Sequence, residues 1–179
     1  MAACKSLVAL ARECGRNAKV GISADVYFSA YDDLLTIEGT TEKYTETIAG
    51  LVDEIGVDPL KKFVKVGTVL NQGGINEDFT GNDNGSFDIV KQLAISLTNL
   101  GSLSTKTFVE SLIGQPVTAL VKLATGTWVA LGLNGQFQLR TSAGIVDPSN
   151  NGRVVTLAGS DSVLVQPVDP LIIPTIIAA

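Results

Sequence analysis

The side chains that could carry out chemistry in this 179-residue chain are few, and their spacing matches no common active site. Histidine is absent, which removes the most common general base and the most common ligand for transition metals. Cys4 and Cys14 have no second pair beside them, so we expect two reduced thiols and no structural zinc site. Ser111 lacks a Gly-x-Ser-x-Gly frame, and no glycine loop has the Lys of a phosphate cradle. The sequence therefore predicts no catalytic residue, no metal and no cofactor.

Several acidic side chains occur in adjacent pairs, at Asp32-Asp33, Asp53-Glu54 and Glu77-Asp78. Two carboxylates that flank a sugar bond are the machinery of glycosidases, so a carbohydrate-binding or hydrolytic module is one hypothesis. Adjacent residues of a strand point to opposite faces, however, so each doublet is a poor catalytic pair by itself. Asp83 and Asp88 do not complete the spacing of an EF-hand calcium loop either. We interpret these residues as solvated acids.

Composition indicates a protein that contacts other subunits. Hydrophobic residues make up 45% of the chain and charged residues only 17%, which leaves more apolar surface than one small core requires. No apolar run is long enough for a membrane-spanning helix, so we expect no membrane insertion. The net charge of −5 comes without a basic stripe, which argues against gripping nucleic acid by its phosphates. The N-terminus lacks the pattern of a secretory signal, so we expect folding in a cytoplasm.

Periodicity predicts a mainly β protein. Alternation of apolar and polar residues predicts two long strands, at residues 20–31 and 87–98. In the second strand Lys91 falls on the apolar side and Val90 on the polar side. Other segments are expected to be a short N-terminal helix at 6–14, a strand at 34–37, a helical turn within 45–55 and a strand at 62–70.

One main helix is expected after Ser104 or Thr105, either of which could cap it, and Gly114 should end it. A β meander follows, with strands at 117–123, 128–133, 137–141, 154–158 and 163–166. Asn134-Gly135 predicts a type I′ hairpin turn within this meander. The elements together predict one domain over residues 1–179, an antiparallel β-sandwich or barrel with one main flanking α-helix.

Two segments are expected to pack against another surface, either of this domain or of a neighbouring subunit. Residues 71–86 are rich in Gly and Asn and form a long loop or a hairpin arm, in which Ile75 and Phe79 could anchor against another surface. Residues 170–179 carry no charge, so they must pack on their own domain, as a last strand of its sheet, or on a neighbouring subunit. The interface candidates in this terminus are Leu171, Ile172, Ile173, Ile176 and Ile177.

The order of these pieces resembles a known family. A VYFSAYDDL strand and a KKFVKV strand lead through the arm to SFDIVKQLAISL. Then come STKTFVESLIGQPVTALVKLATGTWVALGLNGQFQLRTSAG and VVTLAGSDSVLVQPVD. This arrangement is similar to structural proteins of phages that infect Bacteroidota, including crAss-like phages, and to the bacteriophage tail tube family. The resemblance covers most of residues 4–169, and it is a pattern of order and spacing.

The resemblance implies a structural subunit of a virion tail that assembles with itself into stacked, hexameric rings in the host bacterial cytoplasm. It further implies contacts with other tail proteins, and DNA that only passes through an acidic lumen. The arm at 71–86 would reach the adjacent ring, with candidate residues Gly73, Gly74, Ile75, Phe79, Asn82 and Asn84. The strands at 62–70 and 87–98 would line the channel, with candidate residues Lys65, Thr68, Asp88, Gln92, Ser96 and Thr98. Lys65 and Thr68 could share a face only through a bulge near Gly67.

Two alternatives remain open at this point. A capsid decoration or head-completion protein of a phage particle would share the β-rich composition and the excess of apolar surface. A carbohydrate-binding module that uses the acidic doublets belongs to a different class, and it would be a monomer with affinity for a glycan. The native oligomeric state separates these hypotheses best.

Overall fold

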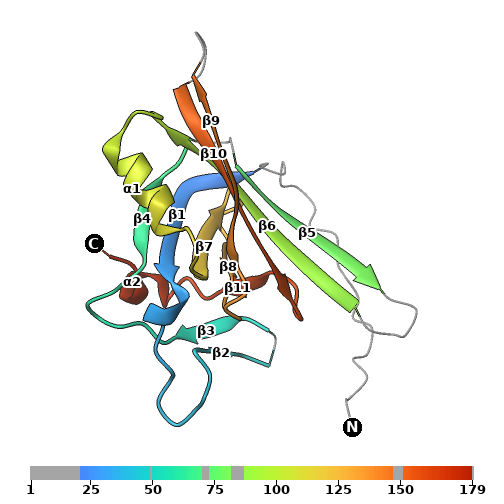
Figure 1. Cartoon of the computed structure of the whole chain (residues 1–179). Coiled ribbons are helices and arrows are strands. Elements are labelled where there is room, and N and C mark those ends of the chain that lie inside the picture. Colours follow the sequence, from blue (N-terminus) through green and yellow to red (C-terminus); the bar gives the residue numbers. More distant parts are fainter. Residues whose placement is uncertain (1–20, 49, 70–72, 82–86, 147–150, 179) are drawn as a thin grey trace.

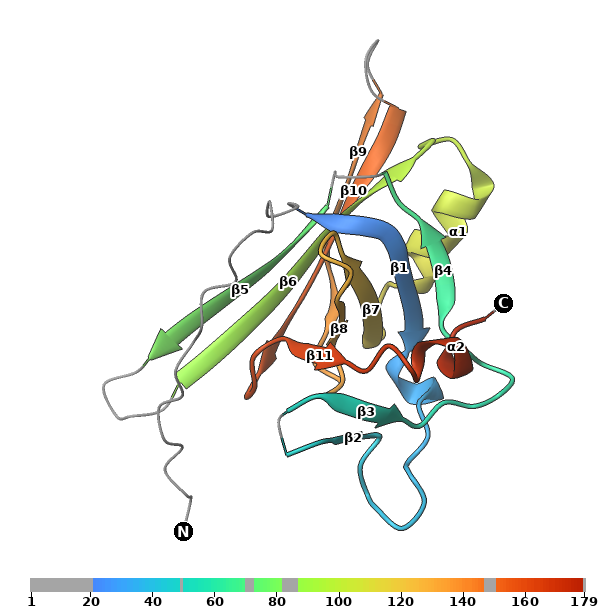
Figure 2. The same ribbon diagram turned by 180° about the vertical axis from the view of Figure 1, so that it is seen from behind.

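The strands of this protein form two sheets that pack face to face (Figures 1 and 2). The computed structural model describes residues 21–48, 50–69, 73–81, 87–146 and 151–178. The predicted helix at 6–14, with Cys4 and Cys14, lies outside the described residues. The predicted fold class, a mainly β sandwich with one main flanking helix, is confirmed.

The larger sheet has seven strands, and the smaller has four. In spatial order the larger sheet contains β2 (Tyr44–Glu46), β3 (Val52–Ile55), β11 (Gln166–Val168), β8 (Trp128–Leu131), β7 (Val117–Leu123), β1 (Ile22–Ala30) and β4 (Val64–Gly67). The smaller sheet contains β5 (Gly74–Gly81), β6 (Phe87–Thr98), β10 (Asn151–Asp161) and β9 (Gln138–Val146). Neighbouring strands are antiparallel, apart from the parallel contact between β3 and β11.

Over the described ranges of the chain, three helical segments join or flank the sheets: η1 (Tyr31–Asp33), α1 (Leu103–Ser111) and α2 (Ile173–Ile176). The main helix is α1, as predicted, and Gly114 follows it with a φ of 78°, a value that favours glycine at the end of a helix. The expected cap, Ser104 or Thr105, is wrong by two or three residues, because Ser102 is the N-cap residue, and its side chain makes no capping hydrogen bond. The helix is held by packing of Val109 and Leu112 on the core.

The seven-stranded sheet is covered on both faces, which explains why β1 buries residues from both of its alternating sets. Val26 and Phe28 belong to a core between the two sheets, which also includes Leu93, Ile95 and Leu157 of the four-stranded sheet. Tyr27, which lies between Val26 and Phe28 and points the other way, belongs to a second core on the far face of the larger sheet. Strand alternation therefore separates two buried faces in β1, whereas the sequence pattern suggested one apolar face and one polar face.

The helical turn expected within residues 45–55 is wrong, because β2 and β3 form an antiparallel hairpin there. The Gly50 amide donates to the Thr47 carbonyl at 2.8 Å, and Gly50 has a φ of 78°. That left-handed conformation breaks a helix and closes a tight turn. Val52 and Ile55 are spaced like residues of a helix face, but both are buried in the second core as residues of a strand.

The hairpin expected at Asn134-Gly135 is also wrong, because β8 and β9 lie in different sheets. Gly135 has a φ of 75° but Asn134 does not have a positive φ, so the turn is not of type I′. Leu133 is buried in the second core, and Phe137 is buried in the core between the sheets. These two apolar side chains on either side of the turn direct the chain across from one sheet to the other.

The apolar C-terminus packs on its own domain as a short helix, and not as a last strand. Ile173 and Ile176 of α2 are buried in the second core, and Ile172 and Ile177 pack against it. The backbone is tied down as well, because the Phe63 amide donates to the Ile176 carbonyl at 3.0 Å. Pro174 within α2 prevents a regular strand here.

Ile173 and Ile176 are therefore corrected from interface candidates to core residues, and Ile172 and Ile177 are partly buried against the same core. Only Leu171 of the predicted set is strongly exposed, at 80% of its surface. The physical reason is that the second core covers the far face of the seven-stranded sheet and needs apolar side chains from outside that sheet.

Packing of the terminus gives a testable expectation. Replacing Ile176 with alanine should lower the free energy of unfolding by about 2–3 kcal/mol, because it leaves a cavity in the second core. The matched change Leu171→Ala should alter it by less than about 0.5 kcal/mol. Chemical denaturation of both variants measures the difference. Equal, small effects would contradict docking of the terminus on its own domain.

Candidate functional site

The exposed face of the four-stranded sheet brings together four of the predicted channel-lining residues, Asp88, Gln92, Ser96 and Thr98. The register of β5, β6, β10 and β9 shows which side chains share this face. It carries Asn76, Asp78 and Thr80 from β5; Asp88, Val90, Gln92, Ala94, Ser96 and Thr98 from β6; Val154, Thr156, Ala158 and Ser160 from β10; and Gln138, Thr141 and Ala143 from β9. We call this set the outer face. The seven-stranded sheet packs on the opposite side (Figures 1 and 2).

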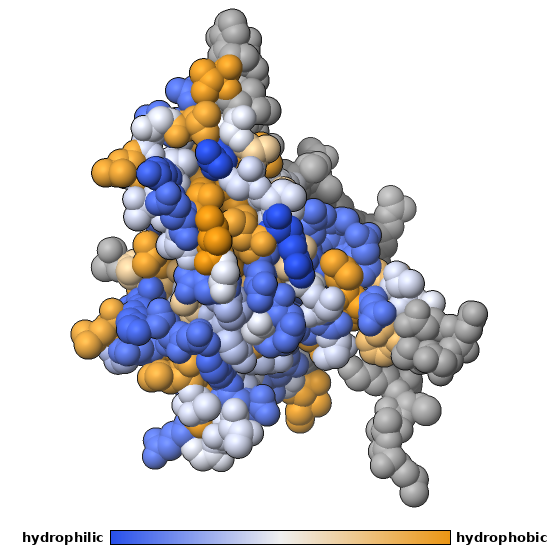
Figure 3. Space-filling view, in the orientation of Figure 1, coloured by the Kyte–Doolittle hydropathy of each residue, from blue (hydrophilic) through white to orange (hydrophobic). Residues whose placement is uncertain are grey.

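Small and polar side chains dominate the outer face, and its charge is acidic. Asp78 and Asp88 are exposed carboxylates, and no lysine belongs to the set. Arg140 lies where the pairing of β9 with β10 shifts by one residue, at the border of the face. In Figure 3, hydrophobic residues interrupt the hydrophilic surface over β6, close to α1 and at the upper end of the β9–β10 pair. The face thus resembles a solvated sheet surface with a few apolar contact points.

The channel-lining candidates separate into two groups. Asp88, Gln92, Ser96 and Thr98 lie together on the outer face, as alternation along the strand predicted. Lys65 does not join them, because β4 belongs to the seven-stranded sheet. Thr68 follows β4 and lies opposite Leu97, whose side chain is buried between the two sheets and not on the outer face.

The position of β4 follows from its contacts. The Lys65 ammonium lies 2.6 Å from the Asp25 carboxylate and 5.8 Å from the centre of the Tyr27 ring. After Gly67 the chain leaves this sheet, and Thr68 makes a single bridge to Leu97 of β6. The predicted bulge at Gly67 is therefore replaced by the end of a strand.

The arm predicted at 71–86 is a hairpin and not an open loop over its described part. Gly74, Ile75 and Phe79 lie in β5, which pairs with β6 from Gly74 opposite Ala94 to Gly81 opposite Phe87. Gly73 directly precedes β5, and Asn82 and Asn84 lie outside the described residues. A β hairpin provides a stiffer projection than a glycine-rich loop, because its backbone groups are paired.

An exposed aromatic pair marks the outer end of this hairpin. The Phe79 and Phe87 rings stack with their centres 5.5 Å apart, and the side chains remain 62% and 48% exposed. Ile75, by contrast, packs against the core between the sheets. We call Phe79 and Phe87 the aromatic tip. Sequence reasoning selected Phe79 but missed Phe87, because the two become neighbours only through the register of β5 and β6.

A buried ion pair joins the two central strands behind the outer face. The Lys91 ammonium lies 2.6 Å from the Asp161 carboxylate, and the side chains are only 2% and 6% exposed. Asp161 also accepts hydrogen bonds from the amides of Ser162 and Val163. Alternation along the strand already placed Lys91 on the apolar side, which signals a buried cation that needs a partner. A substrate would not reach groups this buried, so we assign them a structural role.

A second polar cluster links the side chains of β11 and β2, which lie on either side of β3 in the larger sheet. The Gln166 amide donates to the Tyr44 hydroxyl at 3.4 Å and to the Glu46 carboxylate. Burial raises the pKa of the Tyr44 hydroxyl above its ordinary value, and the nearby carboxylates of Glu46 and Asp161 raise that pKa further. The hydrogen bond from Gln166 opposes this shift. These groups satisfy one another within the fold.

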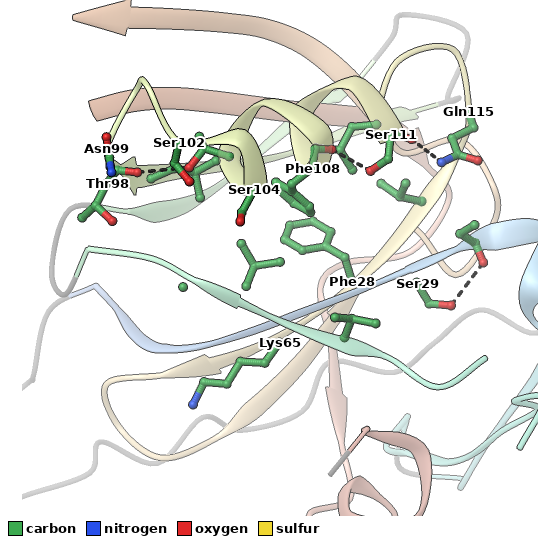
Figure 4. A pocket seen from close by; sticks show the side chains of 18 residues that line it. Phe28, Ser29, Lys65, Thr98, Asn99, Ser102, Ser104, Phe108, Ser111 and Gln115 are labelled. Carbon is green, nitrogen blue, oxygen red and sulfur yellow. Dashed lines mark hydrogen bonds between the residues drawn. The ribbon is translucent and has the colours of Figure 1, made fainter. Parts of the chain in front are cut away.

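A groove of about 650 Å³ lies between α1 and the edge strand β4 (Figure 4). Its apolar part includes Phe28 and Phe108, whose ring centres are 5.6 Å apart, together with Val64. Hydroxyl and amide groups form the rim, and several bond to the backbone beside them. The Ser111 hydroxyl, for example, donates to the Phe108 carbonyl at 2.6 Å. We call this feature the α1–β4 groove.

The acidic doublets do not form a paired-carboxylate site. Asp33 pairs with Lys61 at 2.6 Å, whereas Asp53 accepts a hydrogen bond from the Thr45 hydroxyl at 2.8 Å. Glu77 accepts the Val165 amide at 2.8 Å and so links β5 to the segment before β11. Within the described ranges, no three His, Cys, Asp or Glu side chains gather closely enough to hold a metal ion. Each doublet therefore has local structural partners.

Comparison with protein-family models, with curated proteins and with solved structures found no match to this chain. None of the helices in the described part of the protein has the length and apolar character needed to cross a membrane. The surface features of the described residues that bear on function are the outer face, the aromatic tip and the α1–β4 groove.

Proposed function

We propose that this protein is a structural subunit of a bacteriophage tail tube, which assembles into stacked hexameric rings that conduct DNA. The observation that carries the proposal is the open four-stranded sheet, with a small, polar and acidic outer face and two unpaired edges. Among the described residues, β5 and β9 have a partner strand on one side only. Two parts of the proposal, the hexameric symmetry of the rings and their location in a virion tail, come from the sequence resemblance to tail tube proteins.

The open edges support self-assembly. An unpaired strand presents a row of backbone donors and acceptors that favours pairing with another chain. Pairing β5 of one copy with β9 of the next would continue the sheet from subunit to subunit. Repetition of such a head-to-tail contact closes into a ring when the rotation per subunit permits it. The sheets would then form a wall, with the outer faces toward the lumen.

The chemistry of the outer face supports passage of DNA. A wall with Asp78, Asp88 and neutral hydroxyl and amide groups does not bind phosphates, because binding requires neutralisation by lysine or arginine. A conduit needs this property, since a strongly bound polymer would not slide. Contacts with other tail proteins would occur only at the ends of the tube.

The native assembly tests the proposal. Electron microscopy of the purified protein should show rings or tubes of constant diameter. Compact oligomers that bind only capsids would favour the alternative of a capsid decoration or head-completion protein. A protein that remains monomeric at all concentrations would contradict both assignments.

The outer face gives a second, sharper test. The triple variant Gln92→Lys, Thr156→Lys and Ser160→Lys should form assemblies that bind double-stranded DNA at least about tenfold more tightly than wild type at about 150 mM salt. Gel-shift titration of assembled protein measures the affinity.

The control carries the same added charge on other exposed positions, Thr36→Lys, Thr41→Lys and Thr127→Lys. This control should bind DNA much more weakly than the outer-face variant when both are assembled. Equal DNA binding by the two triple variants would contradict a lumen formed by the outer face.

A further inference from the structure

We propose that the side chains of Lys91 and Asp161 condense slowly into an amide bond after the chain has folded, so that β6 and β10 become covalently joined. The inference goes beyond the proposed function, because the chemistry lies inside one subunit and does not depend on assembly. The two groups are already in contact, with the Lys91 Nζ atom 2.6 Å from the Asp161 Oδ2 atom. The ion pair is the state before reaction, and it contains both reactants of an amide, an amine and a carboxyl group.

Burial distinguishes this pair from an ordinary surface ion pair. The Lys91 and Asp161 side chains are 2% and 6% exposed, whereas those of Lys65 and Asp25, which are also 2.6 Å apart, are 53% and 32% exposed. Charged groups are costly in a site that excludes water. Transfer of a proton across the contact removes both charges and gives a neutral amine and a neutral carboxylic acid. The neutral amine has the free electron pair that a nucleophile requires.

The backbone after β10 prepares the Asp161 carboxyl group for attack. Its Oδ1 atom accepts hydrogen bonds from the Ser162 amide at 2.7 Å and the Val163 amide at 3.3 Å, whereas Oδ2 contacts the lysine. When the amine attacks the Cγ atom, negative charge develops on Oδ1, and two N–H groups directed at that atom stabilise it. The Glu77 carboxylate holds the same segment in place, because it accepts the Val165 amide at 2.8 Å.

A glycine opposite the lysine lets the two side chains meet. Gly159 of β10 pairs directly with Lys91, and Asp161 lies two residues farther along the same strand, opposite Ile89. A β-carbon at Gly159 would lie 2.4 Å from the Gln136 carbonyl oxygen, so backbone packs directly on this position. No side chain of residue 159 therefore separates Lys91 from Asp161, and the close backbone contact limits the access of water that would hydrolyse the product.

The reaction balances without another reactant. A bond forms between Lys91 Nζ and Asp161 Cγ, and the bond between Cγ and Oδ2 breaks. The Oδ2 atom leaves as water with two of the three ammonium protons, and the third proton remains on the amide nitrogen. Condensation is unfavourable between free groups in water, but well-oriented groups in one molecule reach effective concentrations of about 10⁵–10⁸ M.

Mass spectrometry of the intact chain tests for the bond. Folded wild-type protein is incubated, then reduced, denatured and weighed, and most of it should become lighter than its sequence mass by one water molecule. Protein incubated in concentrated guanidinium chloride should keep the full mass, because the two groups are then apart. The variant Lys91→Arg should also keep the full mass, since a guanidinium retains the charge but does not lose a proton to become a nucleophile.

Digestion with trypsin locates the bond. Trypsin cleaves after free lysine and arginine, so the bond should produce a branched peptide in which residues 66–106 are joined to residues 154–179. Cleavage after Lys65 is the internal control, because the exposed Lys65–Asp25 pair has the same separation and should not react.

Two results would overturn the inference. The first is folded wild-type protein that keeps its full mass after prolonged incubation. The second is a loss of water with normal cleavage after Lys91, which would indicate that an aspartate had cyclised onto its own backbone. If Lys91→Arg fails to fold, the comparison of folded with denatured wild type still decides. None of these results depends on rings or tubes, so the bond and the proposed function stand or fall separately.

Discussion

Replacing Lys91 with alanine should lower the free energy of unfolding by about 3–5 kcal/mol. The Lys91 ammonium is the ion-pair partner of Asp161 at 2.6 Å, and both side chains are almost fully buried. Removal of the lysine leaves a carboxylate with no opposite charge in a site of low dielectric constant. Breaking such a pair is far more destabilising than the pair is stabilising, because the remaining charge stays desolvated.

The exposed pair Lys106–Glu110 provides the matched control for this prediction. Its atoms are 3.6 Å apart and its side chains are more than half exposed, so Lys106→Ala should change the free energy of unfolding by less than about 0.5 kcal/mol. Urea denaturation of both variants gives the two values.

The double variant Lys91→Met with Asp161→Asn removes both charges while the new amide still accepts the Ser162 and Val163 amides. It should regain most of the lost stability. If Lys91→Ala is destabilised no more than the Lys106→Ala control, Lys91 and Asp161 are solvated, and their assignment to the buried side of the four-stranded sheet is wrong.

Replacing Phe137 with alanine should lower the free energy of unfolding by a similar amount, about 3–5 kcal/mol. The Phe137 side chain is 1% exposed and lies in the core between the two sheets. It also contacts the turn that carries the chain from β8 to β9, since a side chain at Gly132 would lie 2.5 Å from its β-carbon. Truncation therefore leaves a cavity where the two sheets are joined.

Phe79 is a control of the same residue type. Phe79→Ala should reduce the free energy of unfolding by less than about 1 kcal/mol, because that ring is mostly exposed and stacks on the equally exposed end of the hairpin at Phe87. Comparable losses of stability in both variants would contradict the assignment of Phe79 to an exposed tip.

Much of the fold was predictable from local patterns. The alternation in residues 20–31 and 87–98 predicted β1 and β6, and it placed Asp88, Gln92, Ser96 and Thr98 on one face. The helix stop at Gly114 was equally readable, because a left-handed φ is a property of single residues. These features depend on neighbours within a few positions along the chain.

Features that depend on distant residues were predicted less well. Lys65 was grouped with the β6 residues, although β4 pairs with β1 in the other sheet. Asn134-Gly135 resembled a hairpin turn, but burial of Leu133 and Phe137 in different cores decides the direction of the chain. Strand pairing is chosen by the packing of whole faces, which a local turn signal does not contain.

The sequence by itself determined that this is a β-rich, charge-poor chain without histidine, with alternating strands and a polar face along β6. Only the tertiary structure decided which faces are open. It turned the apolar terminus inward, paired Lys91 with Asp161 seventy residues away, and brought Phe79 beside Phe87 at the end of a hairpin. The reason is that periodicity reports which residues share a face, whereas the long-range packing of sheets determines what covers that face.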